Sequence, residues 1–210
     1  MAKSTKPKSA TSYKETAFGI ISRSQLVPFE AQGVKKALEY IIKISGTKPQ
    51  ITPDLIKDIH KVGFGLIFPN WAGKFRLIEV TVGTYTPPAY YQLPQLVKTL
   101  CDDLTERLNH LPSSFKQEQY LAQVISLLAW FQHRLVWIHP FQDYNGRIAR
   151  LLTNLLLLKL DLPIIEIKAD TKEDRERYIK AMKEADKNNL TELENLLARA
   201  LKENLENLLV

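Results

Sequence analysis

Residues 139–150 read His-Pro-Phe-Gln-Asp-Tyr-Asn-Gly-Arg-Ile-Ala-Arg, and an apolar segment with helical spacing lies on each side of this stretch. The stretch contains a titratable base, a carboxylate, an Asn-Gly pair and two arginines. Two packed helices have little structural need for so much polar chemistry between them. The pattern therefore indicates a helical protein in which a functional loop joins two core helices.

The residue types in this loop suit a nucleotide and a divalent metal ion. His139 has an ordinary pKa near ~6.5, so a neutral imidazole is available to take a proton from an attacking hydroxyl. Asp143 offers the hard oxygen ligand that Mg²⁺ takes together with phosphate oxygens. Asn145 and Gly146 fall where the next helix begins, where Asn is a favoured N-cap and free backbone N–H groups attract anions.

Two arginines extend this site into the following helix. Arg147 and Arg150 are three residues apart, so they share one helix face. Because cations near a helix N-terminus oppose the macrodipole, we expect an anion between them. Single residues of the loop also have ordinary structural explanations, since His139-Pro140 can stop a helix and Asn145-Gly146 can form a turn. The ordered set carries the functional prediction.

This set resembles the signature of the Fic (Fic/Doc) family, HPFx(D/E)GNGRxxR, with one departure: Tyr144 stands where the family most often has Gly. A second segment, Asn70-Trp71-Ala72-Gly73-Lys74-Phe75-Arg76, looks like the family's WAGxxR segment. The resemblance covers roughly residues 50–160. The matching signature residues are His139, Pro140, Phe141, Asp143, Asn145, Gly146, Arg147 and Arg150.

The resemblance implies an all-α helical bundle with a short β-hairpin flap near residues 74–86, lying over the active site. Typical members move AMP from Mg-ATP onto a Ser, Thr or Tyr hydroxyl of a target protein. By this similarity His139 is the catalytic base and Asp143 holds Mg²⁺. The implied nucleotide-binding residues are Phe141, which anchors the loop in the core, Asn145, Gly146, Arg147 and Arg150. The implied target-positioning residues of the flap are Arg76, Ile78 and Val80.

Two other functions stay open at this level. One is transfer of another phosphate-bearing group, such as the γ-phosphoryl group of ATP; Gly146 disfavours it, because Doc-like members tend to carry Lys there. The other is a weakly active Fic-fold binding or toxin module, which only Tyr144 supports. If position 144 needs a left-handed backbone, a residue with a Cβ atom costs roughly 1–2 kcal/mol there.

Restraint of the activity is expected, but its source is not evident. Many family members carry an inhibitory helix with the pattern (S/T)xxxE(G/N). Thr11–Glu15 has the spacing without the ending, and Glu194-Asn195 has the ending without the hydroxyl residue. We expect a separate antitoxin chain, oligomerisation or a degenerate helix instead. Within the chain, the C-terminal helix is the internal candidate: either Glu194 pairs with Arg150, or the helix simply completes the core.

The composition is that of one globular domain with a basic tail. The 210 residues are 45% hydrophobic with a net charge of +6, and removing the four lysines that precede Glu15 leaves about +2. We expect residues 1–12 to be a disordered basic tail and residues 13–210 to form a single domain. Charge confined to a tail gives little support for a nucleic-acid partner.

The sequence favours a cytoplasmic protein with no membrane partner. Cys101 is the one cysteine, which excludes an internal disulfide and fits a reducing compartment. We expect its thiol in the core rather than as a nucleophile. No apolar signal segment is evident at the N-terminus. The apolar run Leu151–Leu160 is too short for a membrane span and predicts a buried central helix.

Periodicity predicts most of the remaining elements. Residues 74–86 alternate with a period of two and are rich in β-branched residues, which favours a hairpin or extended flap. Thr52-Pro53 predicts a helix start with a capping residue and Pro at the first helical position. The other expected helices cover residues 30–44, 93–108, 118–138, 145–160, 170–186 and 189–208.

Overall fold

Seven helices make up most of the computed structural model, which describes residues 3–4, 13–112, 119–168 and 171–207. The prediction of a mainly helical fold is confirmed. The helices are α1 (Arg23–Ser45), α2 (Pro53–Phe64), α3 (Leu93–Asn109), α4 (Tyr120–Ile138), α5 (Asn145–Lys159), α6 (Lys172–Ala185) and α7 (Thr191–Asn207), with a short 3-10 helix η1 (Tyr90–Gln92) before α3.

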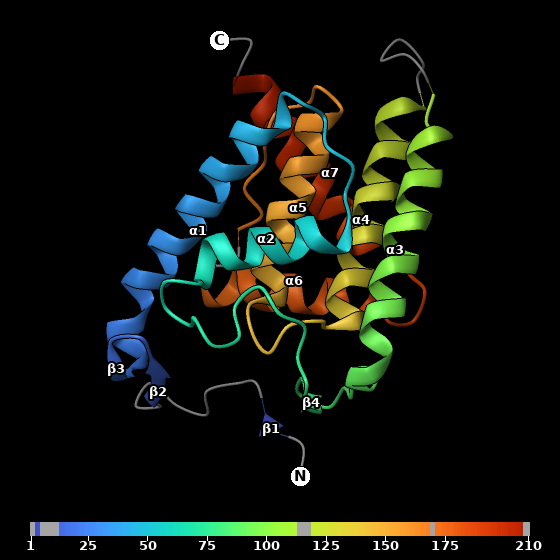
Figure 1. Ribbon diagram of the computed structural model, residues 1–210. Coiled ribbons are helices and arrows are strands. Elements are labelled where there is room, and N and C mark those ends of the chain that lie inside the picture. Colours follow the sequence, from blue (N-terminus) through green and yellow to red (C-terminus); the bar gives the residue numbers. More distant parts are fainter. Residues whose placement is uncertain (1–2, 5–12, 113–118, 169–170, 208–210) are drawn as a thin grey trace.

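Helix α5 lies at the centre of the bundle. It contacts α1 and α2 on one side and α4 on the other, and α4 in turn contacts α3 and α7 (Figure 1). The expected buried central helix is confirmed, because the leucines of α5 form much of the core. Those that are buried are Leu151, Leu152, Leu155, Leu156 and Leu157.

Helix α1 begins seven residues before the predicted start at residue 30, at Arg23. A capping box explains the difference: the Ser22 side chain accepts from the Gln25 backbone N–H, and the Gln25 side chain accepts from the Ser22 backbone N–H. The earlier start adds two turns to the helix ahead of Glu30, which is buried and paired with Arg147 of α5. The predicted start of α2, with Thr52 as N-cap and Pro53 next, is confirmed.

Helices α1 and α2 approach each other through glycine. A Cβ atom on Gly33 would lie 2.0 Å from the carbonyl oxygen of Gly63, so a side chain at position 33 would push the helices apart. Gly63 lies in the last turn of α2. In the fold it lies at the α1–α2 contact, and this close packing helps to set the position of α1 beside the functional loop.

Helix α4 is the one candidate membrane span within the described ranges. By length and mean hydropathy, 1.2 over its best window, it could cross a membrane, but half of that window is buried inside the molecule. The buried core helix of a globular protein has the same properties. Its contacts with α3, α5 and α7 on several sides match that explanation.

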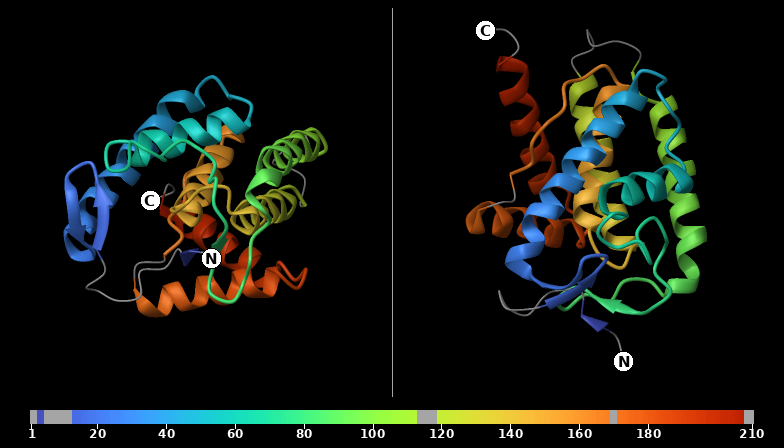
Figure 2. Two further views of the ribbon diagram at one scale, coloured as in Figure 1. Left: turned by 60° about the horizontal axis from the view of Figure 1, so that its bottom comes forward. Right: turned by 60° about the vertical axis from the view of Figure 1, so that its left-hand side comes forward.

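Strands are few and gather near the functional loop. Residues 13–22, which the periodicity did not assign, form an antiparallel hairpin of β2 (Tyr13–Thr16) and β3 (Gly19–Ser22). The hairpin, the loop between α4 and α5, and β4 lie at the same end of the molecule (Figure 2). In the expected tail, Lys3–Ser4 forms β1, whereas residues 1–2 and 5–12 lie outside the described part.

The flap is shorter than the predicted hairpin over residues 74–86. It contains β4 (Val80–Thr81), which pairs in parallel with β1, and a tight turn closed by the Val82–Tyr85 bridge. Gly83 provides the positive φ of 65° that this turn requires. Residues 74–79 form bends and irregular loop without strand pairing. Hydrogen bonds from the Arg76 side chain hold this part of the segment, as described below.

Candidate active site

His139 ends α4 in a left-handed conformation, with φ of 52°. Its Nδ1 lies 3.3 Å from the backbone oxygen of Val136. A carbonyl oxygen can only accept, so Nδ1 carries the proton and Nε2 keeps its lone pair. Burial lowers the pKa of His139 to about 4, against the opposing effect of its hydrogen bond. The imidazole is therefore neutral near pH 7, as a general base requires.

Phe141 anchors the loop that follows. Its side chain is fully buried and stacks on the ring of His60, with ring centroids 3.9 Å apart. The Asn145 side-chain amide bonds both backbone groups of Phe141, each at 2.9 Å. Phe141 therefore has no free face for a nucleotide. The sequence position of Asn145 suggested that it is the N-cap of α5, but the N-cap is Tyr144 and Asn145 is the first residue of the helix.

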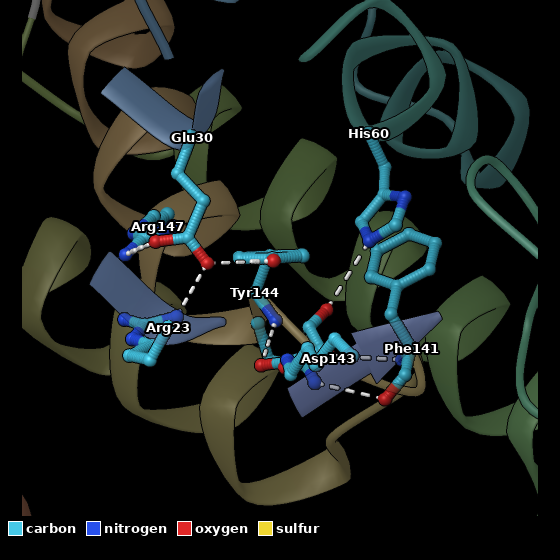
Figure 3. A network of polar contacts seen from close by, with 9 residues as sticks. Arg23, Glu30, His60, Phe141, Asp143, Tyr144 and Arg147 are labelled. Atoms are coloured by element: carbon cyan, nitrogen blue, oxygen red, sulfur yellow. Dashed lines mark hydrogen bonds and ion pairs between the residues drawn. The ribbon is translucent and has the colours of Figure 1, made fainter. Parts of the chain in front are cut away.

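His60 is a loop-holding residue that the sequence analysis did not identify. The Gly73 backbone N–H donates to Nδ1 at 2.9 Å, so Nε2 carries the proton and donates to the Asp143 carbonyl oxygen at 3.2 Å. Burial lowers the pKa of His60 to about 4, although the bond to Asp143 opposes this shift. One neutral ring thus joins the Trp71–Gly73 turn to the loop. Figure 3 shows its bond to the Asp143 carbonyl oxygen.

Arg76 has a different place from the one expected, because it is buried rather than presented to a target chain. Its Nε donates to the His139 carbonyl at 2.9 Å and its Nη1 to the Ile78 carbonyl at 2.9 Å, while Nη2 donates to the Pro88 carbonyl. Burial lowers its pKa from the ordinary value. The guanidinium therefore clamps the flap to the backbone of the catalytic loop.

The other two flap residues line a cavity of about 440 Å³ beside the loop. Ile78 is partly exposed there, whereas Val80 is almost fully buried within β4. Asp143 lines the same cavity, together with Lys14 from the N-terminal hairpin and Trp71. The cavity is thus bounded by the hairpin, the flap and the loop, and Asp143 forms part of its lining.

Asp143 is the residue expected to hold Mg²⁺. Its Oδ1 accepts from the Tyr144 backbone N–H at 2.7 Å, and its Oδ2 is paired with the Lys14 ammonium group. The described residues contain no cluster of three or more His, Cys, Asp or Glu side chains that could hold a metal. Mg²⁺ is often held by one or two carboxylates plus substrate phosphates, so Asp143 fits this role once phosphates arrive. Lys14 already places a cation on this oxygen.

The N-terminus of α5 is open to an anion. No side chain caps it, and its first turn contains no acidic residue. Backbone N–H groups at such an end, together with the helix dipole, favour negative charge. A Cβ atom added to Gly146 would meet only the Arg150 guanidinium, at 3.7 Å, within 4 Å. Asn145 and Gly146 therefore occupy the place expected of them, at the start of the helix.

The two arginines have unequal surroundings. Arg147 Nη2 donates to Glu30 Oε2 at 2.9 Å, while Nη1 is buried without a hydrogen-bond partner among the described groups. The Arg150 guanidinium lies 5.4 Å from the ring centroid of Tyr178. A cavity of about 800 Å³ lies beside both arginines. One of the two arginines expected to bind phosphate is thus paired with a carboxylate. The arginine is Arg147 and the carboxylate is that of Glu30, whereas the sequence suggested Arg150 and Glu194.

Tyr144 adopts the left-handed conformation considered from sequence, with φ of 66° and ψ of 11°. Its hydroxyl donates to Glu30 Oε1 at 2.7 Å, and its ring stacks on Phe64 at 3.9 Å. Burial, aided by the charges of Asp143 and Glu30, raises the pKa of the phenol, so the hydroxyl stays protonated and donates. The side chain that replaces Gly thus joins the loop to α1.

Two reactive residue types lie outside this site. Cys101 is buried, as predicted, and burial raises the pKa of its thiol to about 12, which excludes a thiolate nucleophile near pH 7. His133 is also buried, and its Nε2 lies 2.9 Å from the Asp186 carboxylate. Both side chains therefore have structural surroundings, and for Cys101 this agrees with the sequence prediction.

Comparison with known proteins gives a consistent result. The model of the Fic/DOC family matches residues 50–157 of the chain. The chain is 31% identical over 166 residues to a protein adenylyltransferase Fic of Nematostella vectensis, covering 79% of this chain and 36% of that protein. It is 30% identical over 174 residues to a protein adenylyltransferase Fic of Aedes aegypti, covering 82% and 33%. The chain thus spans about a third of the length of these curated relatives.

Solved structures share the fold. A Fic domain containing signaling protein from Bacteroides thetaiotaomicron superposes with a TM-score of 0.72 at 22% identity, covering 84% of this chain and 70% of that one. The BepC effector protein from Bartonella tribocorum, solved with bound AMPPNP, gives a TM-score of 0.68 at 20% identity, covering 92% and 94%. At these identities the likeness concerns the fold.

Proposed function

The chain belongs to the Fic/DOC family, and from that premise we propose that it is a protein adenylyltransferase that moves AMP from Mg-ATP to a hydroxyl side chain of a target protein. The observation that carries this proposal is the His139 imidazole. It is neutral, its Nδ1–H is fixed on a backbone carbonyl, and its Nε2 is left to accept a proton. This base stands directly before a helix N-terminus that is open to phosphate.

The reaction follows from these groups. The target hydroxyl loses its proton to His139 Nε2, and its oxygen forms a bond to the α-phosphorus of ATP. The bond from that phosphorus to the bridging oxygen of the β-phosphate breaks, and pyrophosphate leaves with the electron pair. Backbone N–H groups at the start of α5 stabilise the charge that builds on the α-phosphate oxygens.

The remaining loop residues hold the nucleotide. Arg147 and Arg150 bind the distal phosphates, and Asp143 would hold Mg²⁺, which would supply positive charge against the phosphates. Before Mg-ATP can bind in this way, two ion pairs must break: that between Lys14 and Asp143 and that between Glu30 and Arg147. We call the arrangement in which Lys14 pairs with Asp143 and Glu30 pairs with Arg147 the resting state. We further propose a cytoplasmic enzyme that acts on other proteins.

Parallel labelling with α-labelled and γ-labelled ATP in cell lysate tests the chemistry. We expect label from α-labelled ATP on protein, including self-modification, because the AMP group carries the α-phosphate. His139→Ala should remove the label without loss of the helical circular dichroism signal. His110→Ala is the matched control, since that histidine is exposed at the end of α3.

The γ-labelled arm separates the two reaction types. Label that reaches protein only from γ-labelled ATP would replace adenylyl transfer with phosphoryl transfer. Equal labelling by His139→Ala and the unaltered protein would remove His139 from the role of base. A protein that binds ATP but labels nothing in either arm would be the weakly active binding module considered from sequence.

A further inference from the structure

Three donors converge on the buried carboxylate of Glu30 (Figure 3). Arg147 Nη2 donates to Oε2 at 2.9 Å. Tyr144 Oη donates to Oε1 at 2.7 Å, and Arg23 Nη1 donates to the same oxygen at 2.5 Å. The Glu30 residue is 2% exposed, so the carboxylate is held by protein groups rather than by water. Its position therefore depends on these donors.

This carboxylate competes with a nucleotide phosphate for Arg147. Both are anions that need the same guanidinium, and Glu30 already occupies one of its edges. A phosphate reaches Arg147 in full only after Glu30 has moved away. The apparent nucleotide affinity is therefore lowered by the fraction of molecules in which Glu30 stays in place. Whatever stabilises Glu30 on Arg147 weakens nucleotide binding.

Tyr144 is better placed than Arg23 to stabilise Glu30. The Tyr144 residue is 6% exposed, whereas the Arg23 side chain is 29% exposed and its charge is partly screened by solvent. The Tyr144 ring is held parallel to the Phe64 ring, at 3.9 Å and 10°. This stacking fixes the direction of the hydroxyl. A buried hydrogen bond to a carboxylate is stronger than one between neutral groups.

We propose that Tyr144 is a positioning residue that acts on the nucleotide through Glu30: its hydroxyl keeps the carboxylate on Arg147 until a nucleotide displaces it. This inference rests on the proposed function, in which Arg147 receives a distal phosphate. The departure from the family's usual Gly then has a role, because Gly has no group that could reach Glu30. Position 144 sets how firmly the resting state is held.

Tyr144→Phe tests the inference, because it removes one oxygen atom and keeps both the stacked ring and the need for a left-handed backbone. We expect Mg-ATP to bind at least roughly tenfold more tightly in calorimetry, since a hydrogen bond to a charged group is lost only from the resting state. The rate of self-labelling at low ATP concentration should rise in parallel. Unchanged or weaker binding would overturn the proposal.

The same substitution in a Glu30→Ala background supplies the decisive control. There the hydroxyl has no carboxylate to hold, so Tyr144→Phe should change the ATP affinity less than roughly twofold. Equal effects in both backgrounds would mean that Tyr144 acts by packing alone, which would also overturn the proposal. Tyr40→Phe, on the same helix as Glu30 but ten residues further along, controls for the chemical change.

Two further measurements keep the result interpretable. If Tyr144→Phe folds poorly by circular dichroism, Arg23→Gln is the second variant, because Arg23 donates to the same Glu30 oxygen as Tyr144. Arg23→Gln should raise the Mg-ATP affinity by a smaller factor than the one expected for Tyr144→Phe. An unchanged affinity would count against the proposal. Calorimetry reads binding without chemistry. An affinity gain without α-label transfer would therefore refute adenylyl transfer while leaving the coupling between Tyr144 and Glu30 in place.

Discussion

Acid should destabilise this protein through two buried histidines. Burial lowers the folded-state pKa of both His60 and His139 to about 4, whereas the unfolded chain has the ordinary value of 6.5. Below pH 6.5 the unfolded state therefore binds more protons than the folded state. The free energy of unfolding must fall as the pH drops from 6.5 towards 4. At pH 5 each histidine should cost roughly 2 kcal/mol relative to pH 8.

Replacing His60 with Gln isolates half of this effect. The variant starts from a lower stability, because the stacking on Phe141 and the bond to Asp143 are altered. Its loss of stability between pH 8 and pH 5 should nevertheless be smaller than that of the unaltered protein by roughly 2 kcal/mol. Carboxylates that titrate in this range contribute equally to both proteins and cancel in the comparison.

Urea denaturation followed by circular dichroism at pH 8, 7, 6 and 5 measures the difference. His110→Gln serves as the control, since that ring is exposed and its loss should leave the pH dependence unaltered. If His60→Gln and the unaltered protein lose the same free energy between pH 8 and pH 5, then His60 is not held neutral by the fold. The account of the loop contact between His60 and Asp143 would then be wrong.

Two other substitutions address the metal and the flap. Asp143→Ala should weaken Mg-ATP binding at least roughly tenfold, about 1.4 kcal/mol, without weakening metal-free ATP binding, because this carboxylate is the metal ligand that we propose for the loop. Calorimetry with and without Mg²⁺ on both proteins measures the difference. Wild-type Mg-ATP affinity in the variant would exclude Asp143 as the ligand. Arg76→Lys should lower the free energy of unfolding by roughly 2–4 kcal/mol, because a single ammonium group cannot reach all three carbonyl groups that the buried guanidinium satisfies. A loss below roughly 1 kcal/mol in urea denaturation would show that the flap is held by other contacts.

The helices could be predicted because their apolar residues recur at helical spacing over long segments. The start of α1 was missed, since its first turns carry few periodic apolar residues and depend on the Ser22 and Gln25 capping box. The hairpin of β2 and β3 is equally local, but it is short and partly polar. Its docking on the Ile67 backbone through Ala17 is a contact between distant segments that periodicity does not reveal.

The loop residues could be identified as a set because they are adjacent in the sequence. Their partners could not, because they come from far along the chain: Lys14 pairs with a residue 129 positions away, and His60 with one 83 positions away. Arg76 was assigned to a target-positioning flap by the family resemblance alone, and a charged side chain is rarely buried unless it is paired. Three backbone carbonyls satisfy its guanidinium in the interior instead.

Tyr144 and Glu30 are each in an unfavourable environment, one with a left-handed backbone and the other with a buried carboxylate, and they are hydrogen-bonded to each other. A left-handed backbone costs a residue with a Cβ atom roughly 1–2 kcal/mol, and a buried carboxylate is unfavourable unless it is fully paired. A hydrogen bond to a charged group contributes about 1.5–3 kcal/mol, which is close to that backbone cost. The pair therefore adds little net stability to the fold. What it does add is a fixed position for a negative charge on Arg147, and conflicts of this kind concentrate where function rather than stability determines the residue.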